Sequence, residues 1–408
     1  MQHEVLIPTY MKTFNCIGSA CEDSCCVGWK VTLDKDTYKK YKNIKEPVLT
    51  AKLKNSMKRN KDVEARDNYY ASFVMGEKGR CPMLEESGLC AIQASVGEEM
   101  LSRTCSTYPR VINKVGDSLE MSAKLSCPEI ARLALLNSEG IDFEYTNIAF
   151  KNNWGQMGWM NTSESANGEY LFWDLRMFAI EILQNRNLHL NDRMILLGLI
   201  IDKVQQAIDR NDYDDIPSII KAYKNKMQDE SFTSSLSRIQ VNHELQLKLI
   251  IEIIEKRNAV GGEIPRYMEC YHEMLQGLNI QGEMIELNDL VKSYELNHKS
   301  YYTPFMMQQG YILENYLVNY VYETLFPNVK GNIFTQFARM SILYSLLRIH
   351  LVGVSGFYKG LSSEIVIKII QSYTRVFEHN ASFMNMISEL FRQNKLESLP
   401  HIVTLLKE

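Results

Sequence analysis

Cysteine is the residue type in this chain whose number and placement point most directly to chemistry. The 408 residues include nine cysteines, and all but Cys270 fall before residue 128. Clustered thiols in a reducing compartment are typical of metal sites or redox groups rather than of structural disulfides. We therefore predict a metal or iron–sulfur site, with redox thiols as the second interpretation. The candidate ligands are Cys16, Cys21, Cys25, Cys26, Cys81, Cys90, Cys105 and Cys127.

The spacing of the first cysteines limits how they can share a metal. Cys21 and Cys25 are four residues apart and would lie on one face of a helical turn. Cys25 and Cys26 are adjacent, and adjacent side chains diverge in a helix or a strand. One ion would not take both comfortably, so the pair serves two different sites or one member only packs.

Two of the later cysteines precede a proline. Pro82 follows Cys81 and Pro128 follows Cys127, and a proline stiffens the chain and removes a backbone donor. The same Cys-Pro step occurs in bacterial ferredoxin cluster motifs. Cys127 also lies at the start of an expected helix, where the helix dipole favours a thiolate.

The sequence leaves two kinds of metal site possible, a zinc site and an iron–sulfur cluster. His3 is the only histidine before His189, which disfavours zinc sites built from cysteine and histidine. An all-thiolate zinc site and a [4Fe-4S] cluster both remain. The absence of paired Cys-x-x-Cys knuckles tilts the choice modestly toward the cluster. The three-cysteine spacing of radical S-adenosylmethionine enzymes is also absent, because Cys26 follows Cys25 at once.

The elements that position these thiols are expected to be short. The pattern predicts a helix over Asp34–Tyr41 capped by Asp34 or Asp36, a strand over 72–75, and a hairpin over 110–125. Ser126 and Glu129 form a capping-box pattern before a further helix. The N-terminal part is therefore read as a loop-rich α+β region.

From Tyr170 onward the sequence reads almost entirely as amphipathic helix. The polar stretch 152–168 predicts a linker or long loop, and the glycine-bearing stretch 351–356 is assigned to a helix–helix turn in preference to a cofactor loop. We predict a mainly α protein, with a cysteine-rich α+β metal-binding domain over 1–150 and a larger all-helical domain over 151–408. The clearest expected helices are Leu171–Leu183, Met194–Ile208, Glu244–Lys256, Tyr311–Phe326, Phe334–Leu351, Glu364–Phe377 and Ala381–Phe391.

Composition excludes several classes of protein. The chain is 45% hydrophobic and 23% charged, unlike a disordered segment, and its net charge of −4 argues against a nucleic-acid binder of the bulk-basic kind. The longest apolar run, Met194–Ile201, is far short of the ~20 residues of a membrane helix. The N-terminus lacks the pattern of a signal peptide. We expect a cytoplasmic protein with no transmembrane segment, and we leave open whether it forms an oligomer.

The cysteine pattern resembles that of the flagellin lysine-N-methylase family and its wider group of zinc- or iron-chelating proteins. A C-terminal helix around Leu313–Tyr320, followed by Leu325-Phe326-Pro327, also resembles the methylase branch. The resemblance covers most of the chain. The residues that carry its cysteine-rich part are Cys16, Cys21, Cys25-Cys26, Trp29, Cys81-Pro82, Gly88-Leu89-Cys90, Ile92-Gln93, Gly97-Glu98 and Thr104-Cys105 with Tyr108-Pro109-Arg110.

This resemblance implies an enzyme that transfers methyl groups from S-adenosylmethionine to lysine ε-amines of flagellin or a similar protein. It also implies a [4Fe-4S] cluster held by the cysteine-rich motif. The alternative is a non-catalytic zinc- or iron-chelating scaffold that binds a partner protein. An iron–sulfur carrier is a third interpretation.

Methyl transfer to lysine requires a neutral amine, which an apolar, tyrosine-lined pocket favours by desolvation. Tyr311, Asn315 and Asn319 lie at helical spacing and form a polar stripe on an otherwise apolar helix. They are our candidate catalytic residues, although a buried hydrogen-bond network explains the same stripe and is favoured. Glu98 and Glu99 are a weaker candidate amine-binding pair.

Overall fold

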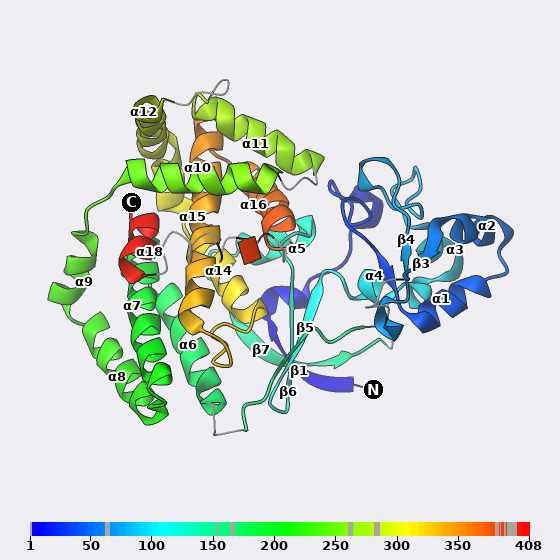
Figure 1. The fold of residues 1–408 in the computed structure, drawn as a ribbon, viewed down its shortest axis with the longest axis horizontal. Helices are drawn as coiled ribbons and strands as arrows, with labels where there is room; N and C mark the ends of the chain where they lie inside the picture. Colours follow the sequence, from blue (N-terminus) through cyan, green and yellow to red (C-terminus); the bar gives the residue numbers. More distant parts are fainter. Residues whose placement is uncertain are drawn as a thin grey trace. The chain divides into compact units, whose positions relative to one another are not determined.

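The computed structural model describes residues 2–61, 66–151, 154–163, 168–259, 264–280, 286–379, 383, 385–386, 389 and 398–408 (Figure 1). It divides into two compact units. The N-terminal unit comprises residues 1–130, 143–159 and 262–265, and the helical unit comprises 131–142, 160–261 and 266–408. The predicted domain boundary at residue 150 stays a prediction, because a compact unit need not be a domain that folds alone.

The N-terminal unit contains a five-stranded mixed sheet in the order β7-β1-β6-β5-β8. The first strand pairs antiparallel with β7 and parallel with β6, where Val5 faces Leu119. The expected hairpin is confirmed as β5 and β6, joined at Gly116 with a positive φ of 58°. The strands are β1 (Gln2–Pro8), β5 (Arg110–Val115), β6 (Ser118–Ala123), β7 (Phe143–Ala149) and β8 (Gly158–Met160).

A second, three-stranded sheet and four short helices form the rest of this unit. The sheet has the order β2-β4-β3, with strands Thr32–Leu33, Ala71–Phe73 and Met57–Arg59 respectively. The expected cap at Asp34 is confirmed, because its carboxylate accepts a hydrogen bond from the Thr37 N–H at 2.8 Å. The helices are α1 (Lys35–Lys42), α2 (Pro47–Ser56), α3 (Ala91–Val96) and α4 (Arg103–Thr107).

The remaining described chain is helical, as predicted. Only short 3-10 and π turns accompany the α-helices between residues 161 and 408 where the structure describes them, and the π turn, His298–Tyr302, precedes α13. The α-helices are α5 (Pro128–Leu135), α6 (Phe172–Leu183), α7 (Leu190–Asp209), α8 (Ile216–Met227), α9 (Glu230–Ser237), α10 (His243–Ala259), α11 (Pro265–Gly277), α12 (Leu287–Asn297), α13 (Thr303–Gln309), α14 (Tyr311–Glu323), α15 (Ile333–Tyr358), α16 (Ser363–Phe377) and α18 (Leu399–Leu406).

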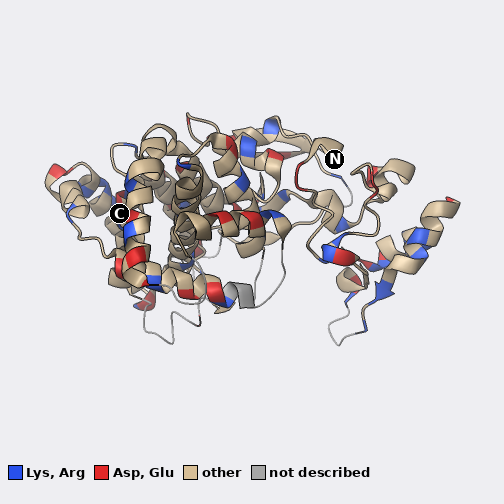
Figure 2. Cartoon of the chain, turned by 90° about the horizontal axis from the view of Figure 1, so that it is seen from above, with Lys and Arg blue, Asp and Glu red and all other residues tan. Residues whose placement is uncertain are grey.

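Helix α15 is the core helix of the helical unit. By length and composition it is the one described helix apolar enough to cross a membrane, yet 94% of its most apolar window is buried inside the protein. That burial is typical of the central helix of a folded α-helical unit. Figure 2 shows basic and acidic residues interspersed along the helices, in keeping with the small net charge.

The turn predicted at 351–356 is wrong, because α15 continues through Gly353 and Gly356 to Tyr358. These glycines serve close packing. A Cβ at Gly277 of α11 would lie 1.8 Å from the Gly353 carbonyl oxygen, and one at Gly356 would overlap the Asn297 amide at 2.1 Å. The stretch therefore forms a helix crossing in which two backbones touch, and it is neither a turn nor a cofactor loop.

Two other expectations need correction. The linker predicted over 152–168 contains β8, which extends the five-stranded sheet at its β5 edge. Helix α14 ends at Glu323, earlier than expected, because Leu325 takes a positive φ of 57°. The other predicted helices are found at close to their expected positions, except Ala381–Phe391, most of which lies outside the described residues.

Candidate functional site

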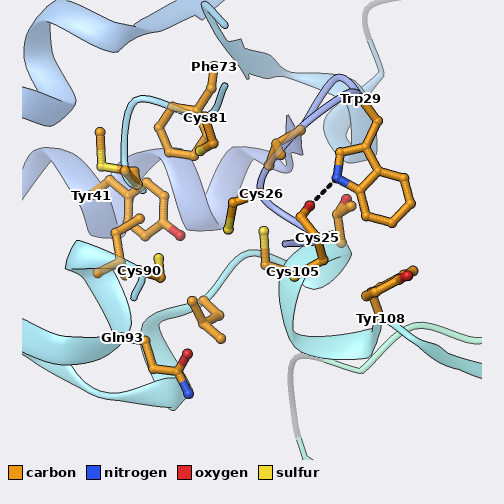
Figure 3. A pocket seen from close by; sticks show the side chains of 15 residues that line it. Cys25, Cys26, Trp29, Tyr41, Phe73, Cys81, Cys90, Gln93, Cys105 and Tyr108 are labelled. Atoms are coloured by element: carbon orange, nitrogen blue, oxygen red, sulfur yellow. Dashed lines mark hydrogen bonds between the residues drawn. The ribbon is translucent and has the colours of Figure 1, made fainter. Parts of the chain in front are cut away.

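Four of the predicted metal ligands meet in the core of the N-terminal unit. Cys81 is a buried member of that core, and Cys26, Cys90 and Cys105 pack against it half-buried. They line one cavity together with Cys25 and aromatic side chains such as Trp29, Tyr41 and Phe73 (Figure 3). Cys26, Cys81, Cys90 and Cys105 are called the thiol tetrad below.

Backbone contacts hold the loops of the tetrad in place. The Cys81 N–H donates to the Cys26 carbonyl oxygen at 2.8 Å, and Cys90 forms an isolated antiparallel bridge with Leu84. Cys90 is the N-cap residue of α3, and Cys105 lies in α4, where its N–H donates to the N-cap hydroxyl of Ser102 at 3.3 Å. Short elements from three separate segments thus direct four thiols to one place.

Two of the tetrad sulfurs, those of Cys81 and Cys90, have backbone donors aimed at them. The N–H groups of Met83 and Leu84 hydrogen-bond to Cys81, and those of Ile92 and Gln93 to Cys90. Burial still raises the pKa of Cys81 to about 11 and that of Cys105 to about 12, because a thiolate is poorly solvated there. N–H donors of this kind stabilise thiolates that carry a metal or a cluster.

All nine cysteines are free, and no group of three or more His, Cys, Asp or Glu side chains in the described part of the chain could hold a metal ion as it stands. The cavity that the tetrad lines has a volume of about 70 Å³. The arrangement has room for a group larger than one ion.

The remaining N-terminal cysteines lie around this core. Cys25 is exposed and lines the same cavity beside Cys26, and a hydrogen bond between the two thiols is the main reason that the pKa of Cys25 is raised. Cys21 follows a 3-10 turn in extended backbone, so the helical turn expected to join Cys21 and Cys25 is wrong. Cys16, Cys21 and Cys127 do not line the cavity.

A larger, polar cleft shares a wall with the cavity. Helix α4 contributes Arg103 to the cleft and Thr104 and Cys105 to the cavity. The cleft measures about 740 Å³, and Lys151 pairs with Glu98 across 2.6 Å at its edge. Its lining residues are Asp34, Asp36, Thr37, Lys40, Glu98, Glu99, Met100, Arg103, Phe150 and Lys151. Sequence reasoning singled out Glu98 and Glu99 but did not connect them with Asp34 and Asp36.

The polar stripe on α14 belongs to the helical unit. In the sequence it lies far from the cysteines of the N-terminal unit, the last of which is Cys127. Asn315 is fully buried, and its amide donates to the carbonyl oxygens of Leu135 at 3.3 Å and Asn137 at 2.9 Å. Asn319 is buried, with its amide 3.5 Å from a carboxylate oxygen of Glu323. These contacts give the two asparagines structural partners.

The third candidate, Tyr311, is half-buried and donates its hydroxyl proton to the Gln309 side chain. Other polar residues of α14 have partners, because Glu314 pairs with Arg193 at 2.7 Å and the Tyr316 hydroxyl donates to Glu378 at 2.8 Å. The Oδ1 atom of Asn315 is buried without a hydrogen-bond partner among the described residues. These contacts form a buried hydrogen-bond network, which is the explanation of the stripe that the sequence analysis favours. The catalytic role of Tyr311, Asn315 and Asn319 stays a prediction.

Comparison with known proteins finds relatives that match most of the chain. A family model described as the FliB lysine N-methylase C-terminal domain matches residues 176–405, more than half of the chain. A lysine-N-methylase of Salmonella typhimurium is 22% identical over 336 residues, which cover 79% of this chain and 78% of the relative. A lysine-N-methylase of Salmonella choleraesuis is 23% identical over 336 residues, which again cover 79% of this chain and 78% of the relative.

A third relative is shorter. The flagellar biosynthetic protein FliU of Salmonella muenchen is 35% identical over 127 residues, covering 30% of this chain and 72% of that protein. No solved structure matches the chain. The resemblance inferred from the cysteines and the α14 motif is thereby confirmed, and the chain belongs to the FliB lysine N-methylase family.

Proposed function

We propose that this protein is a protein-lysine N-methyltransferase that modifies flagellin or a similar flagellar subunit. The methyl donor in this proposal is S-adenosylmethionine, and the thiol tetrad holds a [4Fe-4S] cluster. Two relatives that match most of the chain are named lysine-N-methylases, and the third is named a flagellar biosynthetic protein. The observation that carries the metal part of the proposal is the meeting of four thiols around one cavity.

The cavity suits a cluster better than a zinc ion. A structural zinc site places four sulfurs about 2.3 Å from one point, whereas the thiolates of a [4Fe-4S] cluster bind different irons around a shared core. Cys26, Cys81, Cys90 and Cys105 line a cavity of about 70 Å³, which has room for more than one ion. The N–H groups aimed at Cys81 and Cys90 supply the hydrogen bonds that tune such a cluster. When bound, the cluster would supply a redox-active or Lewis-acidic iron centre.

The reaction itself makes demands on the protein. The lysine nitrogen forms a bond to the methyl carbon as the carbon–sulfur bond of the sulfonium breaks, and the nitrogen gives up a proton. A free lysine has a pKa of about 10.4, so its ammonium must lose a proton before transfer, and desolvation favours that loss. The protein must therefore attract a cationic side chain and then remove it from water.

The acidic side of the cleft beside the tetrad is suited to the first of these tasks. Asp36, Glu98 and Glu99 line it, and a carboxylate-lined concavity attracts a cation. Lys40, Arg103 and Lys151 also line the cleft, and Lys151 pairs with Glu98, so the four carboxylates that line the cleft outnumber its cations by one. We propose that a lysine of the substrate enters here, next to the cavity that Cys105 lines.

The test is an assay of protein purified without air, with flagellin and S-adenosylmethionine as substrates. Mass spectrometry of the flagellin should find methyl groups on lysines. The variant Cys105→Ser should lose this activity, and Cys270→Ser should keep it, since Cys270 is buried in the helical unit, where its sulfur accepts a hydrogen bond from Ser372. Unmodified flagellin from the wild-type reaction, with the cluster present, would favour the metal-binding scaffold instead.

A second pair of variants tests the cleft. Glu99→Gln removes one carboxylate of the cleft and should raise the KM for flagellin while iron content stays unchanged. Glu364→Gln is a matched control, because Glu364 lies in the first turn of α16 in the helical unit. An unchanged KM in Glu99→Gln, and likewise in Glu98→Gln, would refute this entry route for the lysine.

A further inference from the structure

The first two helices of the N-terminal unit carry an excess of positive charge on their outer surface (Figure 1). Residues 30–61 contain eleven lysines and arginines against three aspartates and glutamates, a surplus of eight, whereas the whole chain has a net charge of −4. Seven of these basic residues are fully exposed on α1, α2, β3 and the turn between the helices. They are Lys39, Lys40, Lys42, Lys45, Lys54, Lys58 and Arg59, and they are called the basic face below.

The packing of the two helices explains why these charges face outward. Helix α1 buries Thr37 and Tyr41, and α2 buries Leu49 and Leu53. Tyr41, Leu49 and Leu53 belong to one hydrophobic core, and the two helices pack against each other. Because one face of each helix is fixed inward, the polar residues on the opposite face point to solvent. The basic face is therefore the outer surface of the unit that contains the thiol tetrad.

The basic face has little negative charge of its own to balance it. None of its seven members forms an ion pair with a described residue, although Lys35 and Lys52 of the same stretch do. Two of the three carboxylates in the stretch, those of Asp34 and Glu46, are N-caps of α1 and α2. Unpaired like charges repel one another and attract an anionic partner. Lysines of the helical unit that do pair with a carboxylate are Lys224, Lys256, Lys292, Lys330, Lys368 and Lys407.

The residue types favour a carboxylate-rich protein segment over a nucleic acid or a membrane. The one arginine, Arg59, lies over the Tyr70 ring at 4.3 Å, and the other members are lysines, whereas a phosphate is bound best by a free, bidentate guanidinium. A helix that lies on a membrane needs an exposed apolar face. In α1 and α2 the only exposed large apolar side chain is Val48, at 75%. An exposed valine among lysines suits the mixed apolar and polar contacts of a protein interface.

The basic face adjoins the cleft proposed above as the entry of the substrate lysine. Lys40 belongs to both, and Asp36 and Thr37 of the same helix line the cleft. The cleft offers carboxylates to a lysine, and the basic face offers ammonium groups to the residues that flank it. We infer that the basic face docks an acidic segment of the protein substrate, so that lysines with acidic neighbours are selected. The identity of the partner in this inference rests on the proposed function.

The experiment measures the association rate constant of the full-length protein with immobilised flagellin and with poly-L-glutamate, in the absence of S-adenosylmethionine. Lys39→Glu/Lys54→Glu reverses two charges of the basic face that do not line the cleft. Lys221→Glu/Lys248→Glu is the matched control, because both lysines are exposed on the helical unit. Charge steering raises association rates about tenfold or more. The first variant should therefore bind flagellin roughly tenfold more slowly than the wild type, with a weaker dependence on salt, and the control should match the wild type.

Equal association rates of the two variants with flagellin would overturn the inference. So would tighter wild-type binding to duplex DNA, or to vesicles of anionic lipid, than to poly-L-glutamate. Circular dichroism checks that the variants fold. Lys39→Gln/Lys54→Gln removes the charges without adding carboxylates and should show a smaller loss in the same direction, so it replaces the reversal variant if that variant does not fold.

The two ligands also separate this inference from the proposed function. A wild type that binds poly-L-glutamate through Lys39 and Lys54 but does not bind flagellin would contradict flagellin as the substrate, and it would support the basic face as a docking surface for another acidic protein. A wild type that methylates flagellin, with equal association rates in both variants, would leave the proposed function standing and refute the docking surface.

Discussion

The backbone N–H of Cys81 donates to the carbonyl oxygen of Cys26 at 2.8 Å, so two cysteine motifs that are far apart in the sequence lie side by side. The contact is made by the backbone, and it survives replacement of either sulfur. Cys26→Ser should therefore keep the fold of the N-terminal unit and lose the cluster. Circular dichroism should be unchanged, and iron, sulfide and visible absorption should fall together. Wild-type iron content in this variant would remove Cys26 from the ligand set.

Binding of the methyl donor should be visible as thermal protection. A ligand that binds only the folded state stabilises it by about 2.7 kcal/mol when present at a hundredfold excess over its Kd. S-adenosylmethionine should thus raise the Tm of the anaerobic protein in a concentration-dependent way. Adenosine at the same concentration is the control. No shift at any concentration would count against S-adenosylmethionine as the donor.

The backbone contact between α11 and α15 predicts a sharp intolerance of larger residues. In Gly353→Ala the new Cβ would lie 2.5 Å from the Met274 side chain and 2.8 Å from its carbonyl oxygen. Overpacking of this kind costs about 1–3 kcal/mol or more. Gly331→Ala is the matched control, since its nearest new contact is 3.5 Å. Equal Tm values for the two variants would contradict the close crossing.

The role of Asn315 can be separated into structure and catalysis. Asn315→Asp keeps the size of the side chain but replaces the donating amide with oxygens that face the Leu135 and Asn137 carbonyls. An unsatisfied buried group costs about 1–3 kcal/mol, so denaturant unfolding should show a loss of at least this size. A variant of wild-type stability that has lost only its methyl transfer would instead make Asn315 catalytic.

His350 predicts a stability that falls in mild acid. Its Nδ1 lies 2.7 Å from the Leu346 carbonyl oxygen and its Nε2 3.1 Å from the Tyr267 hydroxyl, so the neutral ring is fully hydrogen-bonded. Burial lowers the pKa of His350 from 6.5 to about 4. Folding favours the neutral ring, so the contribution of His350 to the free energy of unfolding is fully present above pH 6.5. Between pH 6.5 and 4 the unfolded chain gains a proton that the folded chain does not, and the free energy of unfolding falls by up to about 3 kcal/mol.

The measurement is the Tm across that pH range for the wild type and for His350→Gln. The glutamine cannot titrate, so its Tm should depend less steeply on pH than that of the wild type. Parallel curves for the two proteins would show that His350 does not contribute to the acid sensitivity.

Helical periodicity was the most informative local signal in the sequence. The apolar faces of α6, α7, α10 and α16 repeat at helical spacing, and each helix is found close to its predicted range. Glycine misled the same reasoning at α15, because Gly353 and Gly356 meet another helix rather than end their own. A close approach between two helices leaves no mark in the sequence of one helix alone.

The sheet was harder to predict, because its strands pair across the whole N-terminal unit. β1 pairs with β7, whose sequence begins at Phe143, and no local turn signal joins them. The thiols show the same limit. Their residue type identified the candidate site, but only the tertiary fold shows which of them line one cavity. Spacing alone could not show that the adjacent Cys25 and Cys26 both line the same cavity.

Every residue that lines the tetrad's cavity falls between Cys25 and Tyr108, in roughly the first quarter of the chain. Domains generally fold in the order in which the ribosome releases them. The cavity's walls have thus been synthesised before any residue of the helical unit, which begins at Ala131. If the tetrad holds the proposed cluster, its delivery can accordingly act on the growing polypeptide and need not wait for translation to finish.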